Sequence, residues 1–218
     1  PEEVVRMAAA YTPAESGSAA ARDYGAPETM QIPQPRTEKR MEVSMPTFAI
    51  GFKCQPADTP EKAAVQELTG ELAAEILVGE SSALYQRLYE QNIIDSDFSA
   101  DYEYMRGMCL LEASGDSDEP ERVLDELLRE AARIAREGVD EVQLRRLKKS
   151  MLGRRTRALD SFESTCYRMS AYYFEGIEYL DYPALFRRVG AEDVQRFLRE
   201  NIIPERAAIS IIYPKEEA

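Results

Sequence analysis

Seven basic side chains between positions 145 and 157 form the densest set of residues that could do chemistry: Arg145, Arg146, Lys148, Lys149, Arg154, Arg155 and Arg157. Guanidinium and ammonium groups at this density can bind phosphate or an acidic peptide. At helical spacing, however, they surround the apolar positions Leu144, Leu147 and Met151, as charges do on the solvated face of an amphipathic helix. The run leaves both interpretations open, and the spacing favours the solvated face.

Two sets of carboxylates allow a similar choice. Asp116 and Asp118, in the segment GDSDEPE, supply the oxygen ligands that calcium prefers, but the glycine and distal glutamate of a calcium loop are missing. A helix cap accounts for them instead. Glu126 and Glu130 stand at surface helical spacing, and nothing in the sequence indicates that they are buried enough for acid–base work.

Aromatic side chains cluster in the segment FESTCYRMSAYYF, where Tyr172, Tyr173 and Phe174 could stack on a ligand. At the end of an amphipathic helix we interpret them as core residues whose hydroxyl groups reach outward.

The chain contains no histidine, which removes Ser-His-Asp and Cys-His nucleophilic schemes and the common zinc sites built on imidazole. An enzyme that uses carboxylates alone stays open as an alternative, and it would need a pocket with two acids of shifted pKa. We predict no catalytic residue and no metal ligand in this chain.

Charge and cysteine content limit the partners and the setting. With 40 acidic and 27 basic residues the formal net charge is −13, and such a surface repels nucleic acid and anionic lipid. Apolar runs are only a few residues long, too short to cross a bilayer. Cys54, Cys109 and Cys166 are far apart and odd in number, so we expect no disulfide framework and a reducing, cytoplasmic location.

The organisation of the chain changes near residue 38. The chain begins with Pro1 rather than Met, and we therefore expect it to start inside a longer polypeptide. A short helix over 2–11 is followed by a segment rich in Pro, Gly, Ser and Ala, which is linker composition. We predict that residues 1–37 are the end of a preceding unit and its linker, and that residues 38–218 form one domain.

The order of predicted elements in that domain indicates an α+β fold. Strand patterns cover 39–55, with Pro46 between two pieces, then 93–106, 108–115 and 206–214, and Arg106 with Gly107 forms a turn. Helix patterns cover 61–79, 83–91, 116–138, 141–161, 162–174 and 191–201. Thr59, Ser81 or Ser82, Ser117 or Asp118, and Asp140 are the expected helix caps. We predict a mostly antiparallel sheet with helices packed on one face.

Four stretches of the chain resemble the pitrilysin/insulinase-type zinc peptidases (inverzincins), in particular their bacterial members with two half-chains. They are GESSALYQRLYEQNIIDSDFSADYE, with its Ser-x-Leu-x-x-x-Leu pattern, PTFAIGFKC, GVDEVQLRRLKKSML and VGAEDVQRFLRENIIPERAAISIIYP. The resemblance covers roughly residues 30–214 in order and spacing. It is most specific in the first and last of these stretches.

The resemblance implies a division of labour between two homologous α+β halves that close around a peptide. The first half of such proteins carries the zinc motif H-x-x-E-H on its first long helix, and the second half forms the other wall of the chamber. The corresponding helix here, EKAAVQELTGELAAEIL, has no histidine. We therefore expect this chain to be the second half, without a cofactor of its own, with zinc held by a homologous half on the same chain or on a partner subunit.

Two positions correspond to substrate contacts of the family. Active members contribute an Arg and a Tyr from a pattern like L-R-E-K-x-G-L-x-Y, and these side chains contact the substrate carbonyl. Aligned without gaps, Tyr89 stands at the Arg position and Ser96 at the Tyr position. The donor pair is thus absent, and Tyr89 and Ser96 are the candidate substrate-contact residues.

We predict that the chain is the non-catalytic C-terminal half of a zinc-dependent metalloendopeptidase, inactive alone and in contact with the peptide substrate. The alternative is a structural or assembly subunit whose parent has lost its zinc ligands. An isolated half should also expose the surface intended for its partner. Two copies of this chain are therefore expected to be able to form a homodimer.

Overall fold

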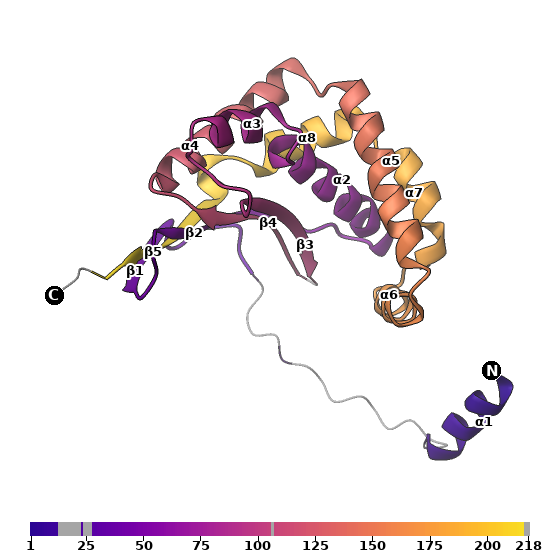
Figure 1. Cartoon of the computed structure of the whole chain (residues 1–218). Coiled ribbons are helices and arrows are strands. Elements are labelled where there is room, and N and C mark those ends of the chain that lie inside the picture. The colour runs from indigo at the N-terminus through magenta and orange to yellow at the C-terminus, as the bar shows by residue number, and fades with distance from the viewer. Residues whose placement is uncertain (13–22, 24–27, 106, 216–218) are drawn as a thin grey trace.

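The computed structural model describes residues 1–12, 23, 28–105 and 107–215, so most of the predicted linker, Arg106 and the last three residues lie outside the described part. Its elements follow the predicted order (Figure 1). They are α1 (Glu2–Tyr11), β1 (Arg36–Met41), β2 (Thr47–Cys54), α2 (Pro60–Val78), α3 (Ala83–Glu90), β3 (Ser99–Met105), β4 (Met108–Asp116), α4 (Pro120–Glu137), α5 (Glu141–Ala158), α6 (Phe162–Phe174), η1 (Tyr179–Asp181), α7 (Tyr182–Arg188), α8 (Ala191–Asn201), η2 (Pro204–Arg206) and β5 (Ala207–Pro214).

The described strands form one mixed sheet in the order β1-β5-β2-β4-β3. β2 is central and antiparallel to both β4 and β5, and β3 is antiparallel to β4. β1 pairs in parallel with β5, with Thr37 opposite Ser210. The two strand pieces predicted around Pro46 therefore exist, but they lie on opposite sides of β5. The α+β class and the mostly antiparallel sheet are confirmed.

Alternation along the central strands decides which face of the sheet is covered. Phe48, Ile50, Phe52 and Cys54 of β2 are buried, and the residues between them are only partly buried. In β4 the same period-two pattern buries Cys109, Leu111 and Ala113. Helices α2, α4 and α8 pack against this face, as Figure 1 shows. This is the alternation expected of a sheet that is covered on one side.

Helix α2 crosses the sheet and forms the centre of the core. Thr59 accepts a hydrogen bond from the Lys62 amide at its start, Pro60 occupies the first turn, and Gly79 follows its last residue, as predicted from the capping signals. The helix buries residues around its circumference, which is typical of a helix enclosed by others. One of them is Gly70, whose backbone meets the ring of Tyr102 on β3.

Helices α5, α6 and α7 continue from this core at one end of the sheet. Asp140 caps α5 by accepting hydrogen bonds from the amides of Val142 and Gln143, as predicted. The predicted cap of α4 was wrong: the cap residue is Glu119, without a side-chain cap bond, and Ser117 accepts from the Glu119 amide before the helix begins. Helix α7 was not predicted, although Pro183 in its first turn is compatible with a helix start.

Within the described residues, no helix combines the length and the apolar character needed to cross a membrane.

Candidate functional site

A groove runs beside the outer edge of β3, which we call the β3 groove. It consists of two adjoining hollows of about 340 and 460 Å³ that share Ala74, Glu75, Ala100 and Arg154. Residues 98–102 form one wall, α2 forms the floor, and α5 forms the opposite wall, with Arg168 of α6 at one end. These volumes are in the range of ligand-binding clefts.

The wall formed by β3 is the edge of the sheet. In the part of the chain that the structure describes, β3 pairs with β4 and with no other strand. Along residues 99–102, which line the groove, no described strand pairs with the side that faces away from β4, so an added strand can pair there. Because the groove lies beside Ala100, Asp101 and Tyr102, an extended peptide could lie there.

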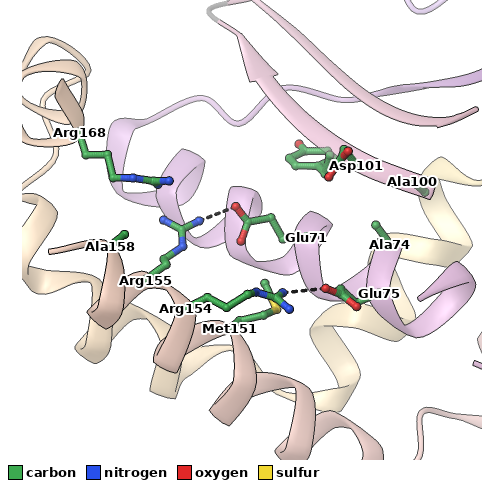
Figure 2. A pocket seen from close by; sticks show the side chains of 11 residues that line it. Glu71, Ala74, Glu75, Ala100, Asp101, Met151, Arg154, Arg155, Ala158 and Arg168 are labelled. Carbon is green, nitrogen blue, oxygen red and sulfur yellow. Dashed lines mark hydrogen bonds and ion pairs between the residues drawn. The ribbon is translucent and has the colours of Figure 1, made fainter. Parts of the chain in front are cut away.

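Ion pairs connect the floor of the groove to its helical wall (Figure 2). Arg154 donates to Glu75 at 2.7 Å, and Arg155 donates to Glu71 in a short contact. The two arginines come from successive positions on α5, and the two glutamates lie one turn apart on α2. The pairs join the α2 floor of the groove to its α5 wall.

Arg155 is the more buried member of these pairs, with 11% of its side chain exposed. Besides Glu71 it lies 3.4 Å from Glu67 and donates to the Tyr172 hydroxyl at 3.0 Å. Its guanidinium also lies over the ring of Tyr182, 3.7 Å from the centroid, which is close enough for a cation–π interaction. One cation thus connects α2, α5, α6 and α7.

Burial raises the pKa of two groups that contact Arg155, the Glu71 carboxyl and the Tyr172 hydroxyl. Burial is the largest cause of the raised pKa of the Glu71 carboxyl, and Glu67 adds to it, whereas Arg155 and Arg168 oppose it. The pKa of the Tyr172 hydroxyl is also raised, first by burial and then by Glu67. At neutral pH the cluster contains a tyrosine that is a hydrogen-bond donor, and it donates to Glu67.

Two charged side chains of the groove have no ion-pair partner among the described residues. Arg168 and Asp101 line the smaller of the two hollows, and no side-chain hydrogen bond or ion pair joins either of them to another described residue. Arg168 extends from α6 toward the centre of the hollow in Figure 2. A guanidinium in this position can accept a carboxylate from a ligand, and Asp101 can accept a cation or an N–H group.

The structure places the two predicted substrate-contact residues apart. Ser96 lines the second hollow of the groove. Tyr89 lies on α3, 51% exposed, with its ring stacked on Tyr85 at 6.0 Å, and it is not part of the groove lining. That Tyr89 and Ser96 contact the substrate stays a prediction.

Other interpretations of the sequence need correction. The basic run is not simply a solvated face, because Arg154 and Arg155 pair with glutamates of α2. Glu130 is buried, contrary to expectation, and is paired with Arg133. Tyr172 is partly buried as expected, but Tyr173 and Phe174 are exposed.

The glutamates of α2 that pair with the basic run were missed, although the sequence holds a signal for them. Glu67, Glu71 and Glu75 recur every four residues in a helix that is otherwise mostly apolar. Such a repeat puts three carboxylates on one helix face. A buried helix with an acidic stripe needs cations from a neighbouring element, and the basic run on α5 supplies them.

The groove does not suit a metal ion. Among the described residues there is no group of three or more His, Cys, Asp or Glu side chains that could hold one. Glu71 and Glu75 already face guanidinium groups, which would repel a cation. The carboxylates on the floor of the groove are the partners of Arg154 and Arg155 on α5.

Comparison with known proteins now identifies the fold that carries this groove. The family model described as "Peptidase M16 inactive domain" matches residues 1–151. The chain belongs to the peptidase M16 inactive-domain family. This confirms the resemblance to the pitrilysin/insulinase-type peptidases.

Relatives of this M16 inactive domain include longer proteins. The "Uncharacterized zinc protease YmfH" of Bacillus subtilis (strain 168) is 31% identical over 183 residues, which are 82% of this chain and 42% of that protein. A putative M16-like peptidase from Alicyclobacillus acidocaldarius has a TM-score of 0.88 at 21% identity, with 98% of this chain and 51% of that chain covered. The M16 inactive domain thus spans about half the length of these relatives.

A third relative is itself an inactive domain. The inactive peptidase domain of a putative zinc protease from Bordetella parapertussis has a TM-score of 0.68 at 16% identity. It is matched over 96% of its chain, and 83% of the present chain is covered. At this identity the likeness concerns the fold.

The raised pKa of Glu71 leads to a prediction about pH. A carboxyl whose pKa is higher in the folded than in the unfolded state stabilises the fold below the unfolded pKa, and this contribution is lost as pH rises through the folded pKa. Glu71→Gln, which stays neutral, should therefore gain stability relative to the parent chain as pH rises from about 4 to about 7. Urea unfolding at several pH values measures this difference.

Glu121→Gln is the matched control with the opposite sign. Its hydrogen bond from Arg36 lowers the pKa of the Glu121 carboxyl, so that contribution is present at neutral pH and lost as pH falls. Over the same rise in pH, the stability of Glu121→Gln relative to the parent chain should therefore fall. If both variants followed the same trend, the assigned cause at Glu71 would be wrong.

Proposed function

We propose that this M16 inactive domain is the non-catalytic half of a zinc-dependent metalloendopeptidase and that it binds the peptide substrate along the β3 groove. The observation that supports this most directly is the position of residues 99–102 at the edge of the sheet, beside the β3 groove. Membership of the M16 family and the word "protease" in the names of the relatives agree with it. The substrate would add one strand to the sheet.

Main-chain pairing would supply most of the peptide affinity, and side chains would supply selection. Successive residues of an added strand point to opposite faces of the sheet. On one face they meet the charged lining of the groove, which includes the guanidinium groups of Arg154 on the α5 wall and Arg168 at one end. A carboxylate or a carbonyl oxygen on the substrate fits these two groups better than an amine does.

In this proposal bond cleavage belongs to a homologous zinc-bearing half. That half would lie on the same polypeptide or on a partner subunit, and it would carry the H-x-x-E-H motif and the zinc that the resemblance implies. Tyr89 and Ser96 stand where the family pattern has Arg and Tyr, so this chain would position the peptide rather than stabilise an oxyanion. We also propose a cytoplasmic location, since Cys54 and Cys109 are neighbours across β2 and β4 and both are free thiols.

A peptide library comes first in the test of this function. The full natural protein that contains this chain should cleave some members of a quenched fluorescent library, and metal analysis should find zinc in it. If the full protein contains no zinc and cleaves nothing, the alternative of a structural or assembly subunit is supported instead.

N-methylation of a cleaved peptide then tests the strand geometry. In an added strand only every second amide faces β3. Methylating that alternate set should weaken binding to this chain at least about tenfold, roughly 1.4 kcal/mol, the size of one or more lost hydrogen bonds. Methylating the other set should change binding little. Fluorescence anisotropy with labelled peptides measures both, and equal effects of the two sets would contradict pairing with β3.

A further inference from the structure

Helix α6 carries a large apolar surface that faces solvent. Phe162, Cys166, Met169 and Tyr173 follow one another at helical spacing, with Phe174 beside them, and we call these five residues the α6 face. Phe162, Tyr173 and Phe174 are 84%, 77% and 82% exposed. Contiguous exposed aromatic groups of this kind mark interaction surfaces in folded proteins.

The packing of this chain does not account for the α6 face. No residue of α6 is buried. The helix is held from its other side, where Tyr172 bonds to Glu67 and Arg155 and packs edge-on against Tyr179 at 5.1 Å. The core would therefore be complete with polar residues on the outer side.

The position of α6 indicates what covers this face. Its inner side contributes Arg168 to the end of the β3 groove, and in Figure 1 the helix lies beyond the end of α5, on the side toward which β3 points. A body that closes over the groove must therefore come close to α6. This relation places the α6 face at the rim of the groove and not on a remote surface.

The length of the relatives indicates the size of that body. This chain covers 42% and 51% of two longer relatives, and each of those proteins therefore has a region about as large as this domain outside the matched part. We propose that the α6 face is the docking surface for this other half of the protein, on which it closes over the groove. The inference rests on the proposed two-half function, but its main readout, the labelling of a thiol, needs no peptide substrate.

A native thiol reports on the α6 face. Cys166 lies in the middle of it and is exposed, whereas Cys54 and Cys109 are buried. Pulse labelling with a maleimide, followed by trypsin and mass spectrometry of the peptide 158–168, measures the reactivity of Cys166 alone. Cys166 should be labelled at least tenfold more slowly in the full natural protein than in this chain at low concentration.

Two variants make the labelling specific. Val142→Cys, in a Cys166→Ser background, puts a thiol at another exposed apolar position, at the start of α5, and it should be labelled at similar rates in both proteins. Phe162→Ser combined with Tyr173→Ser should restore fast labelling of Cys166 in the full protein. Both wild-type side chains are exposed here, so the fold of this domain should tolerate the changes.

Each other result would overturn the docking proposal in a distinct way. Fast labelling of Cys166 in the full protein would show that the α6 face stays open. Protection that grows with the concentration of this chain alone would identify a second copy as the occupant. Protection that requires added peptide would make the face part of the substrate site. If zinc content and peptide cleavage are found while Cys166 remains reactive, the docking proposal fails and the proposed function stands.

Discussion

Arg155→Met should lower the free energy of unfolding by about 3–5 kcal/mol, the usual cost of removing one partner from a buried ion pair. The methionine can fill the space of the side-chain stem, but Glu67 and Glu71 would remain near each other without the cation between them. The contact with the ring of Tyr182 would be lost as well. Urea unfolding followed by circular dichroism measures the change.

Arg154→Met provides the control for this prediction. Arg154 is the neighbouring arginine, pairs with Glu75 at 2.7 Å and has 55% of its side chain exposed. An exposed pair of this kind contributes up to about 1 kcal/mol. Equal losses from the two variants would show that burial of Arg155 is not what matters.

A compensated variant separates charge from packing. Replacing Glu71 and Arg155 together with methionine removes the buried pair rather than breaking it, and exchanges of this kind are often neutral or stabilising. We expect most of the stability lost in Arg155→Met to return. If it does not return, the loss is due to packing between α5 and α7.

Gly70→Ala should lower the free energy of unfolding by about 1–3 kcal/mol, the range for overpacking a close-packed core. A Cβ at position 70 would lie within 2.6 Å of three ring atoms of Tyr102, near the rigid base of that side chain. Alanine is otherwise favoured over glycine inside a helix by about 1 kcal/mol. A loss of stability therefore means that contact with β3 outweighs helix propensity.

The effect of Gly70→Ala on stability should change sign when the ring of Tyr102 is removed. In a Tyr102→Ala chain the three nearest atoms are gone, and Gly70→Ala should then be neutral or stabilising. Thermal unfolding of the four chains in this cycle gives the coupling between the two sites. A coupling close to zero would contradict the close approach of α2 to β3.

Local signals predicted the elements that depend on few neighbours. Thr59 with Pro60, Ser82 and Asp140 cap their helices as expected, because a cap is a contact over two or three residues. The alternation in β2 correctly identified its buried face, since burial on one side of a sheet imposes a period of two. The order of elements followed from these two signals.

Long-range pairing could not be predicted in the same way. Nothing in the segment RTEKRM shows that β1 pairs in parallel with β5, which lies at the other end of the domain's sequence. The division of the chain near residue 38 stays a prediction. Lys53 on β2 donates hydrogen bonds to Glu28 and to the carbonyl of Thr29, which both precede that position. Contacts of this kind depend on the whole topology.

The groove could not be predicted because its charged residues have the sequence pattern of a solvated surface. Arg154 and Arg155 belong to a basic run whose spacing is typical of a solvated helix face, and only the fold brings α2 against α5. Arg168 stands among aromatic residues, with nothing nearby in sequence to suggest a cavity. Ser96, to which a family pattern pointed, lines the groove, and its contact with substrate stays a prediction.

The two outer strands of the sheet differ in how they meet their surroundings. β1 presents exposed Arg36, Glu38, Lys39 and Arg40, and charged edges discourage other chains from pairing. At residues 99–102 the edge of β3 borders the groove, with α5 across from it. Under the proposed function, a strand that enters would therefore be bounded on its far side. The sheet would then gain a single strand, so that peptide binding would saturate at one peptide per chain and would not continue into polymers.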